Sequence, residues 1–190
     1  PEIFTGLWNT VKMVVFGTLI SLFLTFALAY PLNRKDLKGR KFITTLCVFT
    51  MFFSGGLVPL FIVIQGLGLY NTLWAAILPC CVNVWNVIVV RTFISATIPD
   101  DLQEAAQIDG ASDFRVFFQI IIPLCKPIIV IMILFYGVGY WNSYFYPLVL
   151  ISPSNTALKN LQLVMNEILL NDGSGCIGEV ALKYKMLSEA

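Results

Sequence analysis

Residues that could act as catalysts or metal ligands are scarce in this 190-residue chain. It has no histidine, which removes the commonest metal ligand and the usual base at neutral pH. Its five cysteines follow neither a metal-binding nor a disulfide spacing: Cys47, Cys80, Cys81, Cys125 and Cys176. The chain also lacks a glycine-rich phosphate loop of the G-x-x-x-x-G-K-[ST] kind. The sequence therefore predicts no catalytic residue, no metal and no cofactor.

The densest group of ionisable side chains lies between Pro99 and Pro127, in PDDLQEAAQIDGASDFRVFFQIIIPLCKP. This segment holds five of the chain's 11 acidic residues. Leu102, Ala105 and Ala106 fall on one face at helical spacing, and small alanines let another protein approach a helix closely. An acidic amphipathic helix is usually only a solvated face. The pattern alone leaves docking of a partner and simple solvation both open.

Capping signals predict the shape of this segment. Thr97 is expected to cap a first helix, with Asp100 three positions later as the acid of a capping box. Gly110 is expected to end that helix in a left-handed conformation, and Ser112 to cap a second helix. We expect a short helix, a glycine turn and a second helix that leads into the next apolar segment.

Long apolar segments flank this acidic one. The chain is 58% hydrophobic and 12% charged, about half the charged share of a typical soluble domain. Three stretches carry no charge at all: 13–33, 42–90 and 127–158. A membrane-spanning helix needs roughly 20 apolar residues, so the middle stretch is long enough for two. We expect an all-α membrane protein with spans over about 10–30, 42–64, 73–92 and 128–151.

Features inside the expected spans predict how they pack and bend. A stripe of small residues suited to close helix packing lies along the first span: Gly17, Thr18, Ser21 and Thr25. The run SGGLVP, at 54–59, should kink the second span, either to line a pathway or as a tolerated packing kink. Pro79 should interrupt the third span. After the last span, apolar residues at helical spacing predict a short amphipathic helix: Leu161, Val164, Ile168 and Leu169.

Charge in the first loop sets the expected topology. Five basic residues stand there against one acid: Arg34, Lys35, Lys38, Arg40 and Lys41. Basic loops stay in the cytoplasm, which puts the segment 97–127 on the cytoplasmic side and the tail 152–190 outside. Binding of anionic membrane lipid is an alternative use of the same charges, and both readings can hold. The net charge of +1 gives no argument for nucleic acid.

Polar and aromatic residues within the later spans are candidates for lining a translocation path. They are Asn83, Asn86, Trp141, Asn142 and Tyr144. Rings with polar tips suit sugar and peptide sites, but aromatic residues at a span end also form an interfacial belt. Roles in packing remain equally open for all five.

The segment EAAQIDGASDFRVFFQIIIPL resembles the EAA loop of the membrane subunits of bacterial ABC importers. The motif is E-A-A, a glycine after three further residues, and an apolar run that ends at proline. Here these parts are Glu104–Ala106, Gly110 and Ile120–Pro123. The IDGA form, AYPLNRKDLKGR after the first span and YWNSYFYPL in the last are similar to the carbohydrate-uptake group. Ile122 stands where leucine is usual, which is a conservative departure.

This resemblance implies a fold and a mechanism. The fold would be the helical bundle of an importer permease, one domain over 1–190 with four spans of an expected six, so we expect a chain truncated at both ends. The helix after Pro99 would be a coupling helix seated in a cleft of a cytoplasmic ATPase, and the chain itself would hydrolyse nothing. The coupling residues would be Glu104, Ala105, Ala106, Asp109 and Gly110. Glu104 would supply a polar contact, the two alanines a close seat and Gly110 the turn.

The resemblance also implies partners, a location and a solute. The partners would be cytoplasmic ATP-binding subunits, a second permease subunit, an extracytoplasmic solute-binding protein and membrane lipid. The location would be the bacterial inner membrane, crossed several times. The solute would be a sugar or oligosaccharide, with a peptide or amino acid as the alternative. An integral membrane enzyme is less favoured, because the chain has no histidine and every acidic residue lies outside the expected spans. A scaffold or channel would leave the acidic segment unexplained.

Overall fold

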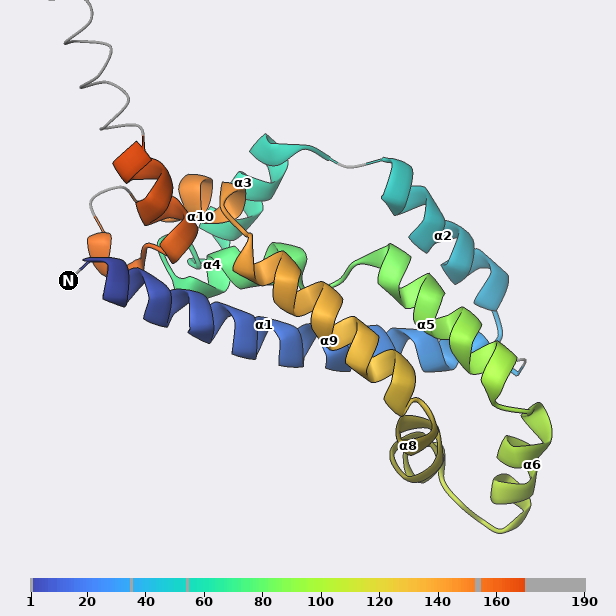
Figure 1. The fold of residues 1–190 in the computed structure, drawn as a ribbon. Helices are drawn as coiled ribbons and strands as arrows, with labels where there is room; N and C mark the ends of the chain where they lie inside the picture. Colours follow the sequence, from blue (N-terminus) through green and yellow to red (C-terminus); the bar gives the residue numbers. More distant parts are fainter. Residues whose placement is uncertain (1, 35, 54, 153–154, 170–190) are drawn as a thin grey trace, which may run out of the picture.

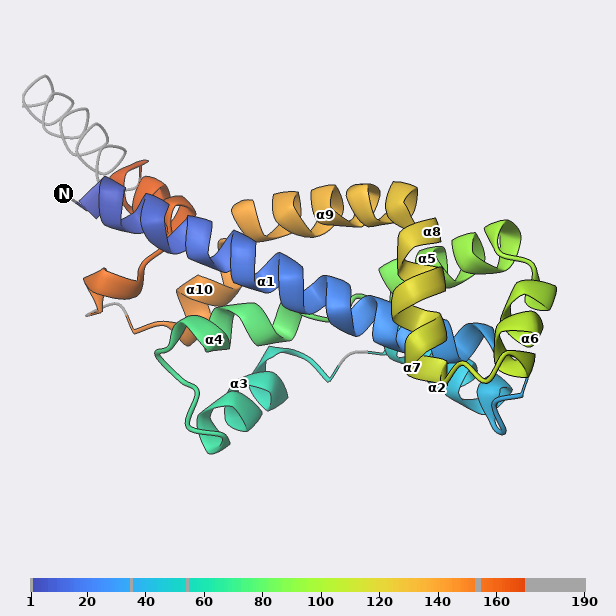
Figure 2. The same cartoon turned by 90° about the horizontal axis from the view of Figure 1, so that it is seen from below.

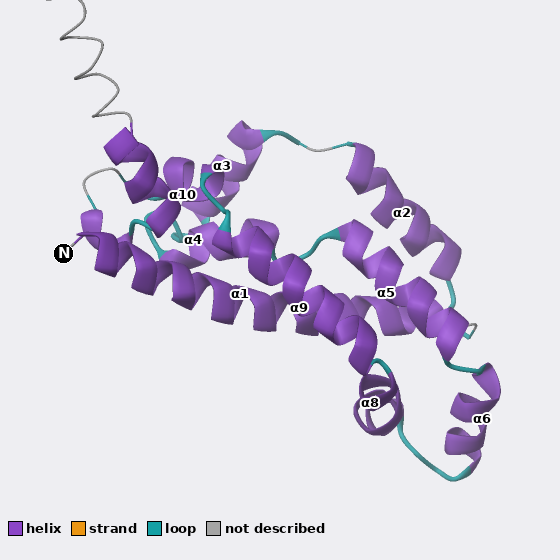
Figure 3. Cartoon of the chain, viewed as in Figure 1, coloured by secondary structure: helices purple, strands orange, loops and turns teal. Residues whose placement is uncertain are grey.

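The molecule is built around one long helix, α1 (Glu2–Asn33). The computed structural model describes residues 2–34, 36–53, 55–152 and 155–169, and within them it contains helices and no strand (Figures 1 and 3). Among the described helices, α1 is the one long and apolar enough to cross a membrane by itself. Three bent pairs would each be long enough together: 40–52 with 57–66, 73–80 with 84–97, and 113–124 with 126–141.

The end of α1 lies three residues beyond the expected boundary at residue 30. The helix passes through Pro31 and ends at Asn33. A proline so close to the end removes one hydrogen bond only, since its ring sits in the last turn. The exposed carbonyls find other donors: the Arg34 amide bonds to the Pro31 carbonyl at 3.1 Å, and Arg40 Nη1 donates to the Asn33 carbonyl at 3.3 Å.

The apolar stretch after the first loop forms two helices rather than one kinked span. These are α2 (Arg40–Phe52) and α3 (Leu57–Gly66), inclined to each other by 113°. Gly56 has φ +87° and ψ 178°, a conformation that a helix cannot pass through and that favours glycine. The break at the SGGLVP run is therefore larger than the expected kink.

The next stretch is also divided. A short helix, α4 (Leu73–Ile77), continues as a 3₁₀ turn, η1 (Leu78–Cys80), and α5 (Val84–Thr97) follows at 50° to them. Pro79 lies in the 3₁₀ turn, so the expected interruption of this span is confirmed. Asn83 starts the new helix, because its side chain accepts a hydrogen bond from the Trp85 amide at 3.0 Å.

The predicted cap at Thr97 is wrong. Thr97 is the last residue of α5, and α6 (Asp100–Ile108) begins three residues later. Pro99 is the physical reason, because a proline disfavours the helical conformation for the residue before it. Ile98 is accordingly extended, with φ −111° and ψ 110°. The proline, rather than the threonine, sets the start of α6.

The turn after α6 has the expected form. Gly110 has φ +80°, in the left-handed region that favours glycine, so this prediction is confirmed. Ser112 occupies the cap position before α7 (Asp113–Val116) but makes no capping hydrogen bond with its side chain. The chain continues through a π-helical turn, η2 (Phe117–Ile121), and α8 (Ile122–Leu124).

The remaining described helices complete the bundle. They are α9 (Lys126–Trp141), α10 (Phe145–Leu150), a 3₁₀ turn η3 (Thr156–Leu158) and a helix over 161–169. The expected span 128–151 thus corresponds to two helices separated at 142–144. The helix over 161–169 lies beside the start of α1 (Figures 1 and 2). There Thr10 Oγ1 accepts a hydrogen bond from the Leu161 amide at 2.9 Å.

The stripe of small residues on α1 is where α9 packs, which confirms the expected close contact. The Tyr140 ring lies so near Gly17 that a Cβ there would be 2.6 Å from a ring carbon. The two helices are also joined by hydrogen bonds between buried hydroxyls. Ser21 Oγ lies 3.0 Å from Tyr140 Oη, and Thr25 Oγ1 lies 2.7 Å from Tyr136 Oη. Since such bonds satisfy polar groups away from water, they fix the register of α9 on α1.

Candidate functional site

The helix α6 stands at the end of the bundle farthest from the N-terminus (Figures 1 and 2). It is nine residues long and follows the extended residue before Pro99. After it, Gly110 turns the chain so that α7 and α8 lead back towards α9. The turn is tied to the helix by a hydrogen bond from the Ala111 amide to the Ala106 carbonyl, at 2.9 Å. In this arrangement α6 projects from the end of the bundle.

The α6 side chains that the structure describes include an exposed set that mixes apolar with acidic groups. Together with the residue after the helix, this set falls within about a third of a turn: Asp101, Leu102, Ala105, Ile108 and Asp109. We call this set the α6 face. Ile108 is 86% exposed, and contact of so much aliphatic surface with water is energetically unfavourable. Its position three residues after Ala105 is the signal that could have added it to the expected coupling residues.

The expected coupling residues do not all lie on the α6 face. Ala105 and Asp109 do, whereas Ala106 is half-buried and packs against the core. Gly110 forms the turn. Glu104 belongs to α6, but its side chain lies outside what the structure describes.

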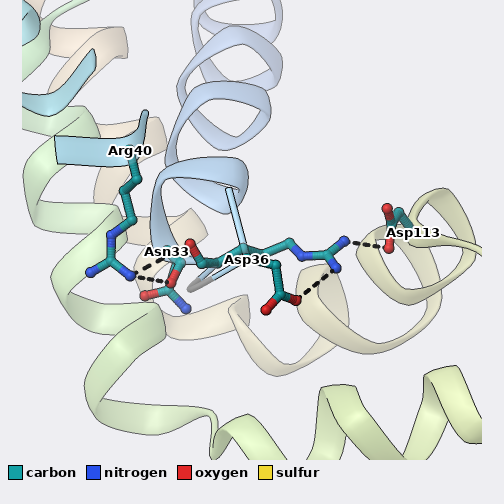
Figure 4. Close-up of polar contacts among 5 residues, drawn as sticks. Asn33, Asp36, Arg40 and Asp113 are labelled. Carbon is teal, nitrogen blue, oxygen red and sulfur yellow. Dashed lines mark hydrogen bonds and ion pairs between the residues drawn. The ribbon is translucent and has the colours of Figure 1, made fainter. Parts of the chain in front are cut away.

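An ion-pair cluster joins the start of α7 to the end of α1. Arg34 Nη1 contacts Asp113 Oδ1, and Arg34 Nη2 lies 3.4 Å from Asp36 Oδ2 (Figure 4). Burial by itself would lower the pKa of the Arg34 guanidinium, but its hydrogen bonds and charge interactions with Asp113, Asp36 and Tyr30 together outweigh burial and the pKa is raised. The arginine therefore stays charged, and it links the α6–α7 turn to the helix that spans the bundle.

Apolar packing supports the same connection. The rings of Tyr30 and Phe117 lie 5.3 Å apart between centroids, tilted by 42°. Phe117 and Val116 are buried, so the start of the α7–α8 segment packs into the core rather than against solvent. A displacement of α6 would meet this packed segment first.

Two of the five candidate path residues come together at the break between η1 and α5. Asn83 and Asn86 line a hollow of about 440 Å³ together with side chains from α2, α9 and α10. Tyr136, Tyr140 and Tyr146 also line it, and sequence reasoning named none of the three as path residues. For Tyr136 and Tyr140, a spacing of four residues on one helix was the available signal. The hollow offers hydroxyl and amide groups beside aromatic rings, a combination that suits a polar solute.

The other three candidates lie apart from this hollow. Trp141 is 40% exposed, and the Asn142 amide closes the end of α9 by bonding to the Val138 carbonyl at 3.0 Å. Tyr144 Oη donates to Asn166 Oδ1 at 3.3 Å, which connects it to the helix over 161–169. In the described part of the chain, histidine, cysteine and acidic side chains form no group of three that could hold a metal ion.

Comparison with known proteins decides the family. Residues 17–170 match the family described as "Binding-protein-dependent transport system inner membrane component". The chain belongs to this family. Membership puts it at a membrane, and the described residues form a helical architecture that agrees with this.

Similar proteins include two from Bacillus subtilis and one solved transporter. "Protein LplC" of Bacillus subtilis is 39% identical over 94% of this chain and 60% of its own length. "Polygalacturonan/rhamnogalacturonan transport system permease protein YtcP" of the same organism is 40% identical over 94% and 61%. A crystal structure of a bacterial ABC transporter involved in the import of the acidic polysaccharide alginate matches with a TM-score of 0.84 and 27% identity, over 93% of this chain and 64% of that one. The chain thus spans less than two thirds of the length of these relatives.

Proposed function

We propose that the chain is a permease subunit of an ATP-driven importer and forms half of the translocation path for a sugar or oligosaccharide. The names of its relatives support the solute class, since they include permeases for rhamnogalacturonan and for arabinooligosaccharides. In this proposal the chain is not an enzyme. It crosses the bacterial inner membrane several times, with a second permease subunit beside it and a solute-binding protein outside.

The observation that carries the proposal is the α6 face. It exposes two large apolar side chains, Leu102 and Ile108, on a helix that stands clear of the bundle. Burying them against a cleft of a cytoplasmic ATP-binding subunit would remove that apolar surface from water. Ala105 lies between them and would let the partner approach the helix backbone closely. Asp101 and Asp109 would meet polar or basic groups at the edge of the cleft.

Movement of α6 would pass to the membrane helices through Arg34. A push on α6 reaches the rigid turn at Gly110 and then Asp113 at the start of α7. The contact between Asp113 and Arg34 transmits it to α1, whose hydroxyl contacts with α9 would carry it across the bundle. We therefore assign Arg34 and Asp113 as positioning residues of the coupling. The hollow at Asn83 and Asn86 would open to one side of the membrane and then the other.

Transport by the reconstituted full-length complex tests this function. Proteoliposomes that contain both permease subunits and the ATPase, supplied with binding protein, should take up an oligosaccharide when ATP is present. Gly110→Pro should abolish uptake, because proline fixes φ near −65° and the turn needs +80°. Glu104→Lys, at a position of α6, should weaken association with the ATPase. If uptake and association both survive Gly110→Pro, the coupling proposal is wrong.

A panel of solutes separates the sugar from the alternatives. Uptake of peptides or amino acids in place of oligosaccharides would agree with the permease function but show that the proposed solute class is wrong. Chemical turnover of a solute by the purified permease without the ATPase would instead favour a membrane enzyme.

A further inference from the structure

A second hollow, separate from the coupling surface and from the asparagine-lined hollow, carries an excess of positive charge. It has a volume of about 790 Å³ and lies where the first loop, the start of α2 and the middle of α5 meet. We call it the basic hollow. Its lining residues are Leu37, Gly39, Arg40, Lys41, Thr44, Thr45 and Arg91. Three of these seven are cationic and none is acidic, so the basic hollow favours an anion.

The described structure pairs none of these three cations with a carboxylate. Arg40 Nη1 donates to the backbone carbonyls of Asn33 and Arg34, at 3.3 and 3.5 Å, which leaves its charge uncompensated. For Lys41 and Arg91 the described residues provide no ion pair. The acid of the first loop, Asp36, is engaged with Arg34 instead.

One further donor, the exposed Thr45 hydroxyl, lines the same hollow. The neighbouring Thr44 hydroxyl donates its hydrogen to the Arg40 carbonyl at 2.8 Å, so it has none left for an anion. Guanidinium, ammonium and hydroxyl groups are the side chains that bind phosphate oxygens. Their combination favours a phosphate group over a carboxylate-bearing peptide, which would need matching backbone partners.

The surface beside the basic hollow is apolar. Phe42, Ile43 and Leu46 follow Lys41 on α2 and are 71%, 38% and 52% exposed, and the structure buries no residue of α2. A free phosphate ion would use the cations alone. A phospholipid would place its phosphate at the cations and its acyl chains along these side chains.

We propose that the basic hollow binds the phosphate of an anionic phospholipid between the first loop, the start of α2 and Arg91 of α5. Arg91 and Lys41 hold the phosphate, and Arg40 contributes charge while it caps α1. The site fixes the first loop against α5, next to the Arg34 cluster. This proposal stands apart from the identity of the transported solute and does not need it.

Lipid retention by the purified full-length transporter complex tests the site. The complex is extracted in mild detergent, and the phosphatidylglycerol that remains bound is quantified by mass spectrometry. Each basic residue adds roughly fivefold to the affinity for an anionic lipid surface, so Arg91→Gln and Lys41→Gln should each lower retention about fivefold. Lys38→Gln is the matched control, since Lys38 is an exposed cation of the same loop that does not line the hollow. Equal retention by all four proteins would overturn the site.

Short-chain lipids distinguish the source of the phosphate. Dihexanoyl phosphatidylglycerol should raise the melting temperature of the wild-type complex, and dihexanoyl phosphatidylcholine and inorganic phosphate at equal ionic strength should not. If inorganic phosphate raises the melting temperature equally and Arg91→Gln loses this effect, the hollow binds an anion but the proposed lipid is wrong. No response to either phosphate compound would overturn both.

Two further measurements separate lipid binding from failed assembly and from binding of a protein. Arg91→Lys keeps the charge and should retain phosphatidylglycerol, and if Arg91→Gln fails to assemble, the exposed Lys41→Gln decides the question. Loss of the ATPase subunit from Lys41→Gln with unchanged lipid retention would show that these cations bind protein, and the proposal would be wrong.

Discussion

The Tyr140 hydroxyl lies 3.0 Å from Ser21 Oγ, and the tyrosine ring closes over Gly17 one turn earlier on α1. Tyr140 on α9 therefore contacts both the Ser21 hydroxyl of α1 and the α1 backbone at Gly17, which has no side chain. The same hydroxyl lies 3.2 Å from the Ile77 carbonyl, so Tyr140 joins α1, α4 and α9 at one buried point. These contacts fix how α9 packs against α1.

Gly17→Ala should destabilise this contact. The added Cβ would stand 2.6 to 2.8 Å from three carbons of the Tyr140 ring, which must then shift in a packed core. Overpacking of this kind costs about 1–3 kcal/mol, and the melting temperature of the complex should fall. Gly139→Ala is the control, because a Cβ there meets nothing within 4 Å. Equal melting temperatures for the two variants would contradict the close packing.

Ser21 and Tyr140 should be energetically coupled. Interhelical hydrogen bonds within membranes average about 0.6 kcal/mol in double-mutant cycles, and a coupling of this size is expected from Ser21→Ala, Tyr140→Phe and the double variant. Tyr140→Phe alone should cost more than Ser21→Ala alone, since it also removes the contact with the Ile77 carbonyl. Strictly additive unfolding free energies in a detergent titration would show that the two hydroxyls do not interact.

Arg34→Gln and Asp113→Asn should uncouple ATP hydrolysis from transport with little effect on stability. The Asp113 side chain is 61% exposed, and an ion pair so open to water contributes roughly 0.2–1 kcal/mol. The measurement is solute molecules transported per ATP hydrolysed in proteoliposomes. Asp36→Asn is the control, because Asp36 also pairs with Arg34 but belongs to the first loop and not to α7. An unchanged ratio in all three variants would remove Arg34 from the transmission route.

Ile108→Asn should weaken the association of the ATPase. Ile108 is the most exposed large apolar side chain of the described chain, at 86%, and burying such a side chain contributes roughly 1.5–3 kcal/mol. Co-purification of the ATPase should therefore drop at least about tenfold. Leu67→Asn is the control, since Leu67 is a 66% exposed aliphatic side chain in the turn after α3. If both substitutions have the same effect, the α6 face is not the docking surface.

Local signals predicted the parts of the structure that depend on one residue and its neighbours. Gly110 was expected in a left-handed turn because few other residues adopt positive φ, and the stripe from Gly17 to Thr25 was expected to take close packing because its side chains are small. Both predictions are confirmed. The interruption at Pro79 follows from the same kind of reasoning, since a proline lacks the amide that a helix interior needs.

Helix boundaries depended on competing signals and tertiary contacts depended on distant residues, so neither could be predicted. The end of α1 extends through Pro31 because Arg40, seven residues beyond Asn33, supplies a donor for the last carbonyl. Thr97 was expected to cap α6, but Pro99 sets the start of that helix. The sequence contains both signals and does not show which of them prevails. Tyr136 and Tyr140 were missed because only the tertiary contact with α1 shows what their hydroxyls meet. The Arg34–Asp113 pair joins residues far apart in sequence, and charge alone could not choose this partner among the other acids.

The most direct test of the coupling role asks whether α6 is covered by the ATPase. A single cysteine replaces Ala105 in a full-length transporter whose native cysteines are changed to alanine, and its labelling by a maleimide is measured with and without the ATPase subunit. Leu67→Cys in the same background is the reference, because it lies away from α6. We expect that assembly protects Ala105→Cys from labelling, that a bifunctional reagent joins it to the ATPase, and that Leu67→Cys is unaffected. Equal labelling of Ala105→Cys in the presence and absence of the ATPase would contradict the coupling role of α6.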